Sequence, residues 1–150
     1  MLSISDWNSL ESTVTKIIVD NGVSESGLTE LDLTRFSQLK RLEIGDHCFS
    51  FVDELKLIGM NELESVVIGE NSFTQHKNYY GSDPNRHFHL KNCPKLKSLK
   101  MGRYSFSDYS VIEIETVNAL EVIEMGAVGQ LGYSFYYASL ELKSILDRNE

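Results

Sequence analysis

The sequence predicts a β-rich α/β-type solenoid, in which short strands dominate and helix is scarce. Three observations support this fold class. An apolar pattern recurs with a period of about 24 residues, each unit carries two short alternating apolar stretches, and a glycine follows the longer stretch in four of the five units. Self-similarity at such a period is typical of repeat proteins, whose units cannot bury an apolar side alone.

The longer stretch has the form Leu-x-x-apolar-x-apolar-Gly and begins at residues 39, 63, 96 and 120. A degenerate copy begins at Val14 and has Asp20 in place of the glycine. The starts are 25, 24, 33 and 24 residues apart, which indicates one insertion of nine residues. We expect the apolar residues of these copies and the phenylalanines that follow three of them to form the core: Leu39, Leu42, Ile44, Phe49, Leu63, Val66, Ile68, Phe73, Leu96, Leu99, Met101, Phe106, Leu120, Ile123 and Met125.

The shorter stretch is an apolar alternation that lies six residues before each of the last four starts. It covers residues 31–33, 55–57, 88–90 and 112–114, and a similar stretch covers residues 140–142. Alternation with a period of two predicts strands, and both kinds of stretch are too short for independent helices. Turn-forming residues such as Asn61, Asn92 and Asn118 separate the two stretches. Each unit is therefore expected to contribute two strands.

Stacking of similar units would let the apolar residues of each copy pack on the next and form one elongated core. The glycine after the longer strand would let the chain turn with positive φ or pass close to its neighbour. The recurring phenylalanine would fill the wider part of each unit. This arrangement predicts a single domain over residues 1–150 with about five repeats.

Residues 63–73, with the sequence LESVVIGENSF, fit the pattern L-x-x-L-x-L-x-x-N-x-(L/F). The chain therefore resembles leucine-rich-repeat domains, of the irregular kind found in BspA-like and protist proteins. The resemblance covers roughly residues 10–142, although other copies place His47, Tyr104 and Val128 where this one has Asn71. It implies a right-handed coil that binds another protein through its repeat face, with no catalytic residue and no cofactor.

Charge and composition exclude several classes of protein. The chain has 14 basic and 22 acidic side chains, a net charge of −8, which argues against nucleic-acid binding because phosphate neutralisation needs a surplus of Lys and Arg. No apolar run has the length of a membrane span, and the first residues lack the features of a signal peptide. The two cysteines, Cys48 and Cys93, form no disulfide framework. Together these features favour a cytoplasmic location.

Stacking would also align the polar positions of successive units into columns about 4.8 Å apart. One such column has alternating charges after its first member: Thr15, Lys40, Glu64, Lys97 and Glu121. A second column contains two apolar residues: Ile18, Glu43, Val67, Lys100 and Glu124. The first fits a surface ladder that fixes the register of the strands, and both also fit a mixed-charge binding face.

The inserted residues lie within residues 74–87, and insertions in repeat arrays often map to surface loops that bind. Residues 75–103 contain seven basic side chains and one acid. We expect a protein partner with an acidic or phosphorylated surface to bind here, since tyrosine and arginine are enriched at interfaces. The predicted partner-binding residues are Lys77, Tyr79, Tyr80, Arg86, Lys97 and Lys100. A solvated loop that balances acidic neighbours is the alternative.

Other functions were weighed on the same residues. His76, His87, His89 and Cys93 match no zinc module, so no metal site is expected. A parallel β-helix enzyme acting on carbohydrate stays as an alternative, and would require two carboxylates in one groove. Self-assembly is a further alternative, because the unit that ends with residues 140–142 shows no polar cap and would expose a strand edge to a second copy.

Overall fold

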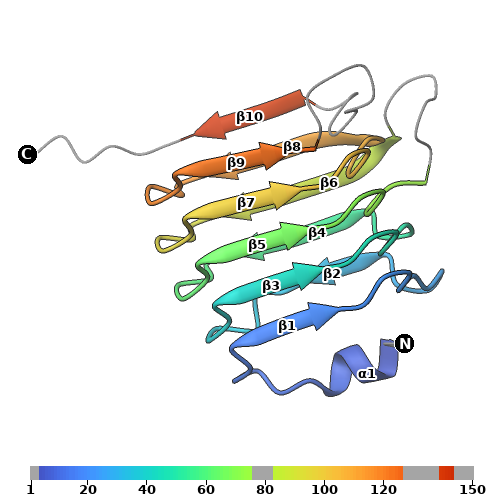
Figure 1. Cartoon of the computed structure of the whole chain (residues 1–150), viewed down its shortest axis with the longest axis horizontal. Helices are drawn as coiled ribbons and strands as arrows, with labels where there is room; N and C mark the ends of the chain where they lie inside the picture. The colour runs from blue at the N-terminus through green and yellow to red at the C-terminus, as the bar shows by residue number, and fades with distance from the viewer. Residues whose placement is uncertain (1–3, 76–82, 127–138, 144–150) are drawn as a thin grey trace, which may run out of the picture.

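The computed structural model describes residues 4–75, 83–126 and 139–143, which form two parallel β-sheets and one short helix (Figure 1). The helix is α1 (Ile4–Ser9), and it is the only helix of the described residues. The predicted predominance of strands is confirmed, and the arrangement is compatible with a β-rich solenoid. No helix of the described part is long and apolar enough to cross a membrane.

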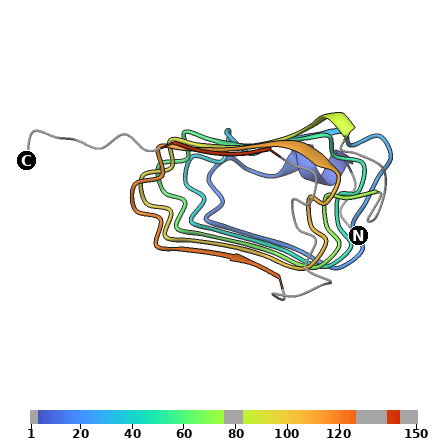
Figure 2. The ribbon, with the colours of Figure 1, turned by 90° about the horizontal axis from the view of Figure 1, so that it is seen from above.

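Each sheet has five strands in register. Sheet A has the order β1 (Lys16–Val19), β3 (Arg41–Ile44), β5 (Ser65–Ile68), β7 (Ser98–Met101) and β9 (Val122–Met125). Sheet B has the order β2 (Glu30–Asp32), β4 (Glu54–Ile58), β6 (Asp83–Lys91), β8 (Tyr109–Glu115) and β10 (Ser139–Lys143). The chain alternates between the sheets, so each strand pairs with the strand two places along. Figure 2 shows the sheets as two facing layers.

Both predicted stretches lie on strands, the longer in sheet A and the shorter in sheet B. The predicted register is also confirmed, because equivalent positions of successive copies are aligned partners. Ile17, Leu42, Val66, Leu99 and Ile123 follow one another across sheet A. Sequence spacings of 25, 24 and 33 residues between copies therefore give the same alignment, since the insertion lies outside the strands of sheet A.

The core lies between the sheets and contains most of the predicted residues. The phenylalanines form a row, with ring centroids 5.4 Å apart for Phe49 and Phe73 and 4.8 Å apart for Phe73 and Phe106. Leu120, Ile123 and Met125 are the exception, since Leu120 is only partly buried and the other two are exposed. The reason is their place in sheet A: β9 is its last strand, so no further strand of the described residues stacks on them.

Helix α1 covers the N-terminal end of the core, a role that the repeat pattern does not predict. The indole of Trp7 is buried and meets the rings of Phe36 and Phe49 edge-on, at centroid distances of 6.0 and 6.1 Å. Arg35 fixes this segment, because its guanidinium donates hydrogen bonds to the carbonyl oxygens of Leu10 and Trp7 at 2.7 and 2.8 Å. The first repeat thus has a cap.

The glycines after β3, β5 and β7 are required by close approach between neighbouring chain segments. At Gly69 an added Cβ would lie 2.3 Å from Asp46 Oδ1 and 2.6 Å from the carbonyl carbon of Gly45. Gly45 and Gly102 face the same obstacle from the preceding segment, and none of the three has positive φ. Of the two explanations that the sequence offered, close approach is the one that holds at these three positions.

We expect Gly69→Ala to lower the free energy of unfolding by about 1–3 kcal/mol, because the new methyl group overlaps backbone atoms that cannot move away freely. Urea denaturation at neutral pH measures this change. The control is Ser98→Ala, a partly exposed position on β7, which should change stability by less than about 0.5 kcal/mol. Equal stability of Gly69→Ala and the unsubstituted chain would contradict the close approach.

Candidate functional site

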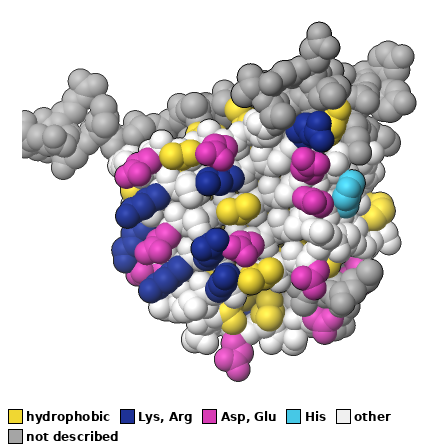
Figure 3. Space-filling model, in the orientation of Figure 1, with side chains coloured by type: hydrophobic (Ala, Val, Ile, Leu, Met, Phe, Trp, Pro, Cys, Tyr) yellow, Lys and Arg dark blue, Asp and Glu magenta, His cyan; other side chains and the backbone are white. Residues whose placement is uncertain are grey.

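The outer face of sheet A presents mixed charges with apolar residues among them (Figure 3). The two predicted columns exist. The amide of Lys40 donates to the carbonyl of Thr15, and the same bond recurs from Glu64 to Lys40, from Lys97 to Glu64 and from Glu121 to Lys97. The strand register aligns Ile18, Glu43, Val67, Lys100 and Glu124. A third column of aligned residues contains Lys16, Arg41, Ser65, Ser98 and Val122. We call the surface formed by these three columns the A face.

Three basic groups of the A face form no ion pair with the described residues. Arg41 pairs with Glu43 at 2.6 Å, and Lys100 pairs with Glu124 at 3.9 Å. Lys16, Lys40 and Lys97 form no ion pair with any described residue. Ile18 is 55% exposed and lies two residues from Lys16 on β1. The A face therefore combines lysines that form no ion pair with the described residues and exposed apolar surface.

The outer face of sheet B is different, because Lys56 and Lys91 both pair with carboxylates across the strands. Lys56 pairs with Glu30 at 3.2 Å and Lys91 with Glu113 at 2.5 Å. The ring of His89 lies between two carboxylates, 3.2 Å from Glu54 and 3.8 Å from Glu113. The Lys91 ammonium donates a hydrogen bond that lowers the pKa of Glu113, although partial burial opposes the shift. This face is a ladder of ion pairs that supports the register.

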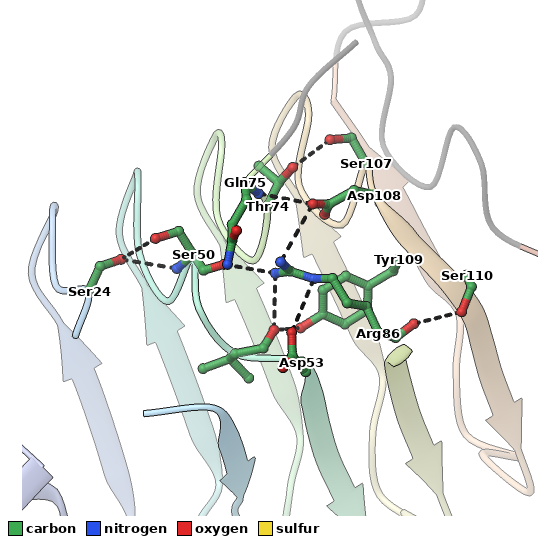
Figure 4. Close-up of polar contacts among 11 residues, drawn as sticks. Ser24, Ser50, Asp53, Thr74, Gln75, Arg86, Ser107, Asp108, Tyr109 and Ser110 are labelled. Carbon is green, nitrogen blue, oxygen red and sulfur yellow. Dashed lines mark hydrogen bonds and ion pairs between the residues drawn. The ribbon is translucent and has the colours of Figure 1, made fainter. Parts of the chain in front are cut away.

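Arg86 does not lie on the surface, contrary to the prediction that it binds a partner. It is 1% exposed and reaches between the sheets from β6, where its guanidinium donates to the carbonyl oxygens of Ser50 and Val52 at 2.9 and 3.1 Å (Figure 4). Its Nη1 lies 3.5 Å from Asp108 Oδ2, and its Nε lies 3.9 Å from Asp53 Oδ1. Arg86 is buried because the chain returns from the insertion into sheet B, where a bulge between Asp83 and His87 shifts the register.

Two buried residues complete the cluster around Arg86. Asp108, 3% exposed, also accepts a hydrogen bond from the backbone N–H of Gln75 at 3.1 Å. Tyr109 stacks below the guanidinium, 5.0 Å from Arg86 Cζ, and donates its hydroxyl to the carbonyl of Val52. Burial raises the pKa of Tyr109 well above its ordinary value, so the phenol stays a neutral donor. We call these residues the Arg86 cluster, and its contacts are those of an internal clamp.

Side-chain hydroxyls continue the polar contacts next to this cluster. Thr74 and Ser107 share a hydrogen bond of 2.7 Å, and Ser24 and Ser50 share one of 3.2 Å (Figure 4). Ser72 bonds the backbone carbonyl of Gly45 and accepts from the amide of Cys48, one unit below. The bonds of Ser72 satisfy backbone groups of the neighbouring segment, where no strand pairing does so.

The structure separates the predicted partner-binding residues. Lys97 and Lys100 are exposed on the A face, whereas Arg86 belongs to the interior and to sheet B. Lys77, Tyr79 and Tyr80 lie outside the described residues, so their part in binding stays a prediction. The basic band of residues 75–103 is therefore not one surface patch, because consecutive strands belong to opposite sheets.

Metal binding and thiol chemistry find little support in the described part of the chain. No group of three or more His, Cys, Asp or Glu side chains there is placed to hold a metal ion. Cys48 and Cys93 are buried free thiols, and burial raises the pKa of both. A raised pKa keeps a thiol protonated and therefore a poor nucleophile. The Cys48 Sγ instead lies 3.1 Å from the carbonyl oxygen of Asp20.

Comparisons with protein-family models, with curated proteins and with solved structures gave no match.

Sequence reasoning missed the Arg86 cluster and the cap formed by Trp7. One signal for the cluster was present, because Asp108 and Tyr109 directly follow Phe106-Ser107 and so lie at the entrance of a strand in sheet B. A lone arginine two residues before the apolar pair Phe88 and Leu90 was read as part of the loop. Its burial becomes visible only once the bulge in β6 is known.

We expect Arg86→Met to lower the free energy of unfolding by about 3–5 kcal/mol, because the change leaves the Asp108 carboxylate buried without its cation. Chemical denaturation measures the loss. In the double variant Arg86→Met/Asp108→Asn part of the stability should return, since the orphaned charge is gone. Lys97→Met, an exposed lysine, is the matched control and should change stability by less than about 0.5 kcal/mol. Similar stabilities for the two Met variants would contradict a clamp.

The Glu113 pair on sheet B predicts a dependence on pH. Because the folded state lowers the pKa of Glu113, its stabilisation is present above about pH 4.3 and is lost as pH falls through the folded pKa. Glu113→Gln should therefore lower the free energy of unfolding by up to about 1 kcal/mol at pH 7 and by almost nothing near pH 3. Urea denaturation at both pH values measures this, with the exposed Glu121→Gln as control. A loss of equal size at both pH values would refute the assignment.

Proposed function

We propose that the chain is a leucine-rich-repeat solenoid, a right-handed coil, that acts as a non-catalytic protein-interaction module. The pattern of residues 63–73 and the alternation of the chain between two parallel sheets support the class. Right-handed connections between parallel strands are nearly universal, which supports the hand of the coil. A protein partner, with neither nucleic acid nor cofactor, fits the acidic composition and the absence of catalytic motifs in the sequence.

The observation that supports binding through the A face is the contrast between the two sheets. On sheet B Lys56 and Lys91 are both paired within the chain, so an acidic partner would have to break ion pairs to bind there. On the A face Lys16, Lys40 and Lys97 have no such partners among the described residues, and Ile18 and Val67 lie in the neighbouring column. Desolvating unpaired lysines against an acidic partner forms new ion pairs without breaking old ones.

The partner that fits this surface is a protein with an acidic or phosphorylated segment and at least one apolar side chain. The A face carries five basic and four acidic side chains, a net of +1, in a chain whose net charge is −8. The net charge of the whole chain thus repels an acidic partner at long range, and recognition depends on contacts at the face. Elevated salt screens such exposed pairs, so binding should weaken as ionic strength rises.

We expect Ile18→Asp to abolish capture of the partner, because it places a charge at the most exposed apolar residue of the A face. The readout is affinity capture from an extract of the source cells, quantified by mass spectrometry for the unsubstituted chain and each variant. Phe51→Asp is the matched control: Phe51 is 38% exposed, lies outside both sheets, and should keep the partner.

The proposal requires proteins that bind the unsubstituted chain and Phe51→Asp, fail to bind Ile18→Asp, and dissociate at high salt. Identical capture by Ile18→Asp and the unsubstituted chain would exclude the A face as the binding surface. Charge reversal at Lys77 tests the insertion separately, without disturbing the buried Arg86.

A further inference from the structure

The turn after β1 contains the only asparagine of the sequence that precedes a glycine. Asn21 and Gly22 are both exposed, and Gly22 has a φ of 80°. A Cβ added at Gly22 would meet no atom within 4 Å, so the space beside this glycine is open. Glycine has no side chain to hinder its own backbone nitrogen, which can therefore attack the side-chain amide of the preceding asparagine.

Asn21 is part of a hydrogen-bond ladder that joins successive units. Its Oδ1 accepts from the backbone N–H of Asp46 at 2.7 Å, and the N–H of Gly22 donates to the Asp46 carbonyl oxygen at 2.8 Å. Asp46 takes the equivalent position one unit later, where its Oδ1 accepts from the N–H of Glu70 at 2.8 Å. The ladder thus contains an amide oxygen in one unit and a carboxylate oxygen in the next.

We propose that Asn21 is a site of deamidation, and that the folded state suppresses the reaction. The Gly22 nitrogen loses its proton to water and bonds to Asn21 Cγ; the bond from Cγ to the side-chain nitrogen breaks, and that nitrogen takes up a proton and leaves as ammonia. Water then opens the succinimide ring. Breaking the bond from Cγ to the Gly22 nitrogen gives aspartate, whereas breaking the bond from the backbone carbonyl carbon of residue 21 to that nitrogen gives isoaspartate.

The contacts with the second unit oppose this reaction. The Gly22 N–H is already donated to the Asp46 carbonyl, and the side chain of Asn21 is held close to Gly45, where an added Cβ would lie 2.3 Å from Asn21 Oδ1. Attack therefore requires the first two units to separate at this turn. Local separation near the end of a chain costs less free energy than global unfolding. The reaction rate then follows the population of the open form.

The two products differ in how they fit the ladder. Aspartate at residue 21 leaves the backbone unchanged, and its carboxylate can accept from the N–H of Asp46 as Asp46 accepts from Glu70. Isoaspartate adds the side-chain methylene to the backbone, so that the N–H of residue 22 moves away from the Asp46 carbonyl. The aspartate product is therefore compatible with the turn, whereas isoaspartate loosens β1 from β3.

Mass spectrometry of peptides from the aged full-length chain measures the conversion. At neutral pH we expect it at Asn21 both in guanidinium chloride and in the folded chain, where it should be at least about fivefold slower because two hydrogen bonds must break first. Asn61 is the internal control, since it is also exposed in a turn but precedes Glu62, and it should convert far more slowly. No conversion at Asn21 in guanidinium chloride would overturn the site, and equal rates in the two states would overturn its suppression.

Two serine variants test whether the separation is local. Ser24→Ala removes the bond at 3.0 Å from the Ser50 N–H to Ser24 Oγ, which joins the first two units close to Asn21. Ser110→Ala removes a bond between later units, from its hydroxyl to the carbonyl of Arg86 at 3.1 Å. Ser24→Ala should raise the folded-state rate about twofold or more, whereas Ser110→Ala should leave it unchanged. Equal folded-state rates in the two variants would overturn local separation.

The stability of the two products tests the ladder itself. Asn21→Asp should unfold at the same denaturant concentration as the unsubstituted chain. Aged chain that contains isoaspartate at residue 21, separated by ion exchange, should unfold at a lower concentration. Equal midpoints for these two forms would overturn the assigned role of the ladder. All of these measurements use the chain alone, so this proposal and binding through the A face fail separately.

Discussion

The close stacking of successive chain segments is the constraint on which the rest of the structure depends. Parallel strands lie about 4.8 Å apart, so every position of one unit must be compatible with the same position of the next. Glycines at residues 45, 69 and 102 satisfy this at the tightest point, where a Cβ would overlap backbone atoms of the preceding segment. The row of phenylalanines and the columns of buried aliphatic residues satisfy the same condition, because similar side chains stack on one another in successive units.

The same constraint explains why the two outer faces differ. In a column of aligned side chains, like charges repel and opposite charges attract at short range. On sheet B, Lys56 and Lys91 meet this condition by pairing with Glu30 and Glu113. The A face meets it only in part, since Ile18 and Val67 dilute one column. Charged side chains that form no ion pair within the chain can still form one with another molecule.

The sequence was sufficient to predict the strands and their register, because both follow from a periodic pattern of apolar residues. The columns from Thr15 to Glu121 and from Ile18 to Glu124 needed only the period and the rule of alternation. The Arg86 cluster could not be predicted in this way. It arises where the period breaks, and an arginine after an insertion gives no sign whether it faces water or the interior. The capping role of Trp7 could not be predicted for a related reason, because the capping helix is not part of any repeat.

The lysines of the A face that form no ion pair with the described residues are spread along the stack of strands. Lys16 and the exposed Ile18 belong to β1, Lys40 directly precedes β3, and Lys97 directly precedes β7. A partner with two acidic segments at matching separation would gain from binding near β1 and near β7 at once, because the second contact is made at high effective concentration. The acidic net charge of the chain limits attachment elsewhere, so selectivity would come from that spacing as much as from either contact.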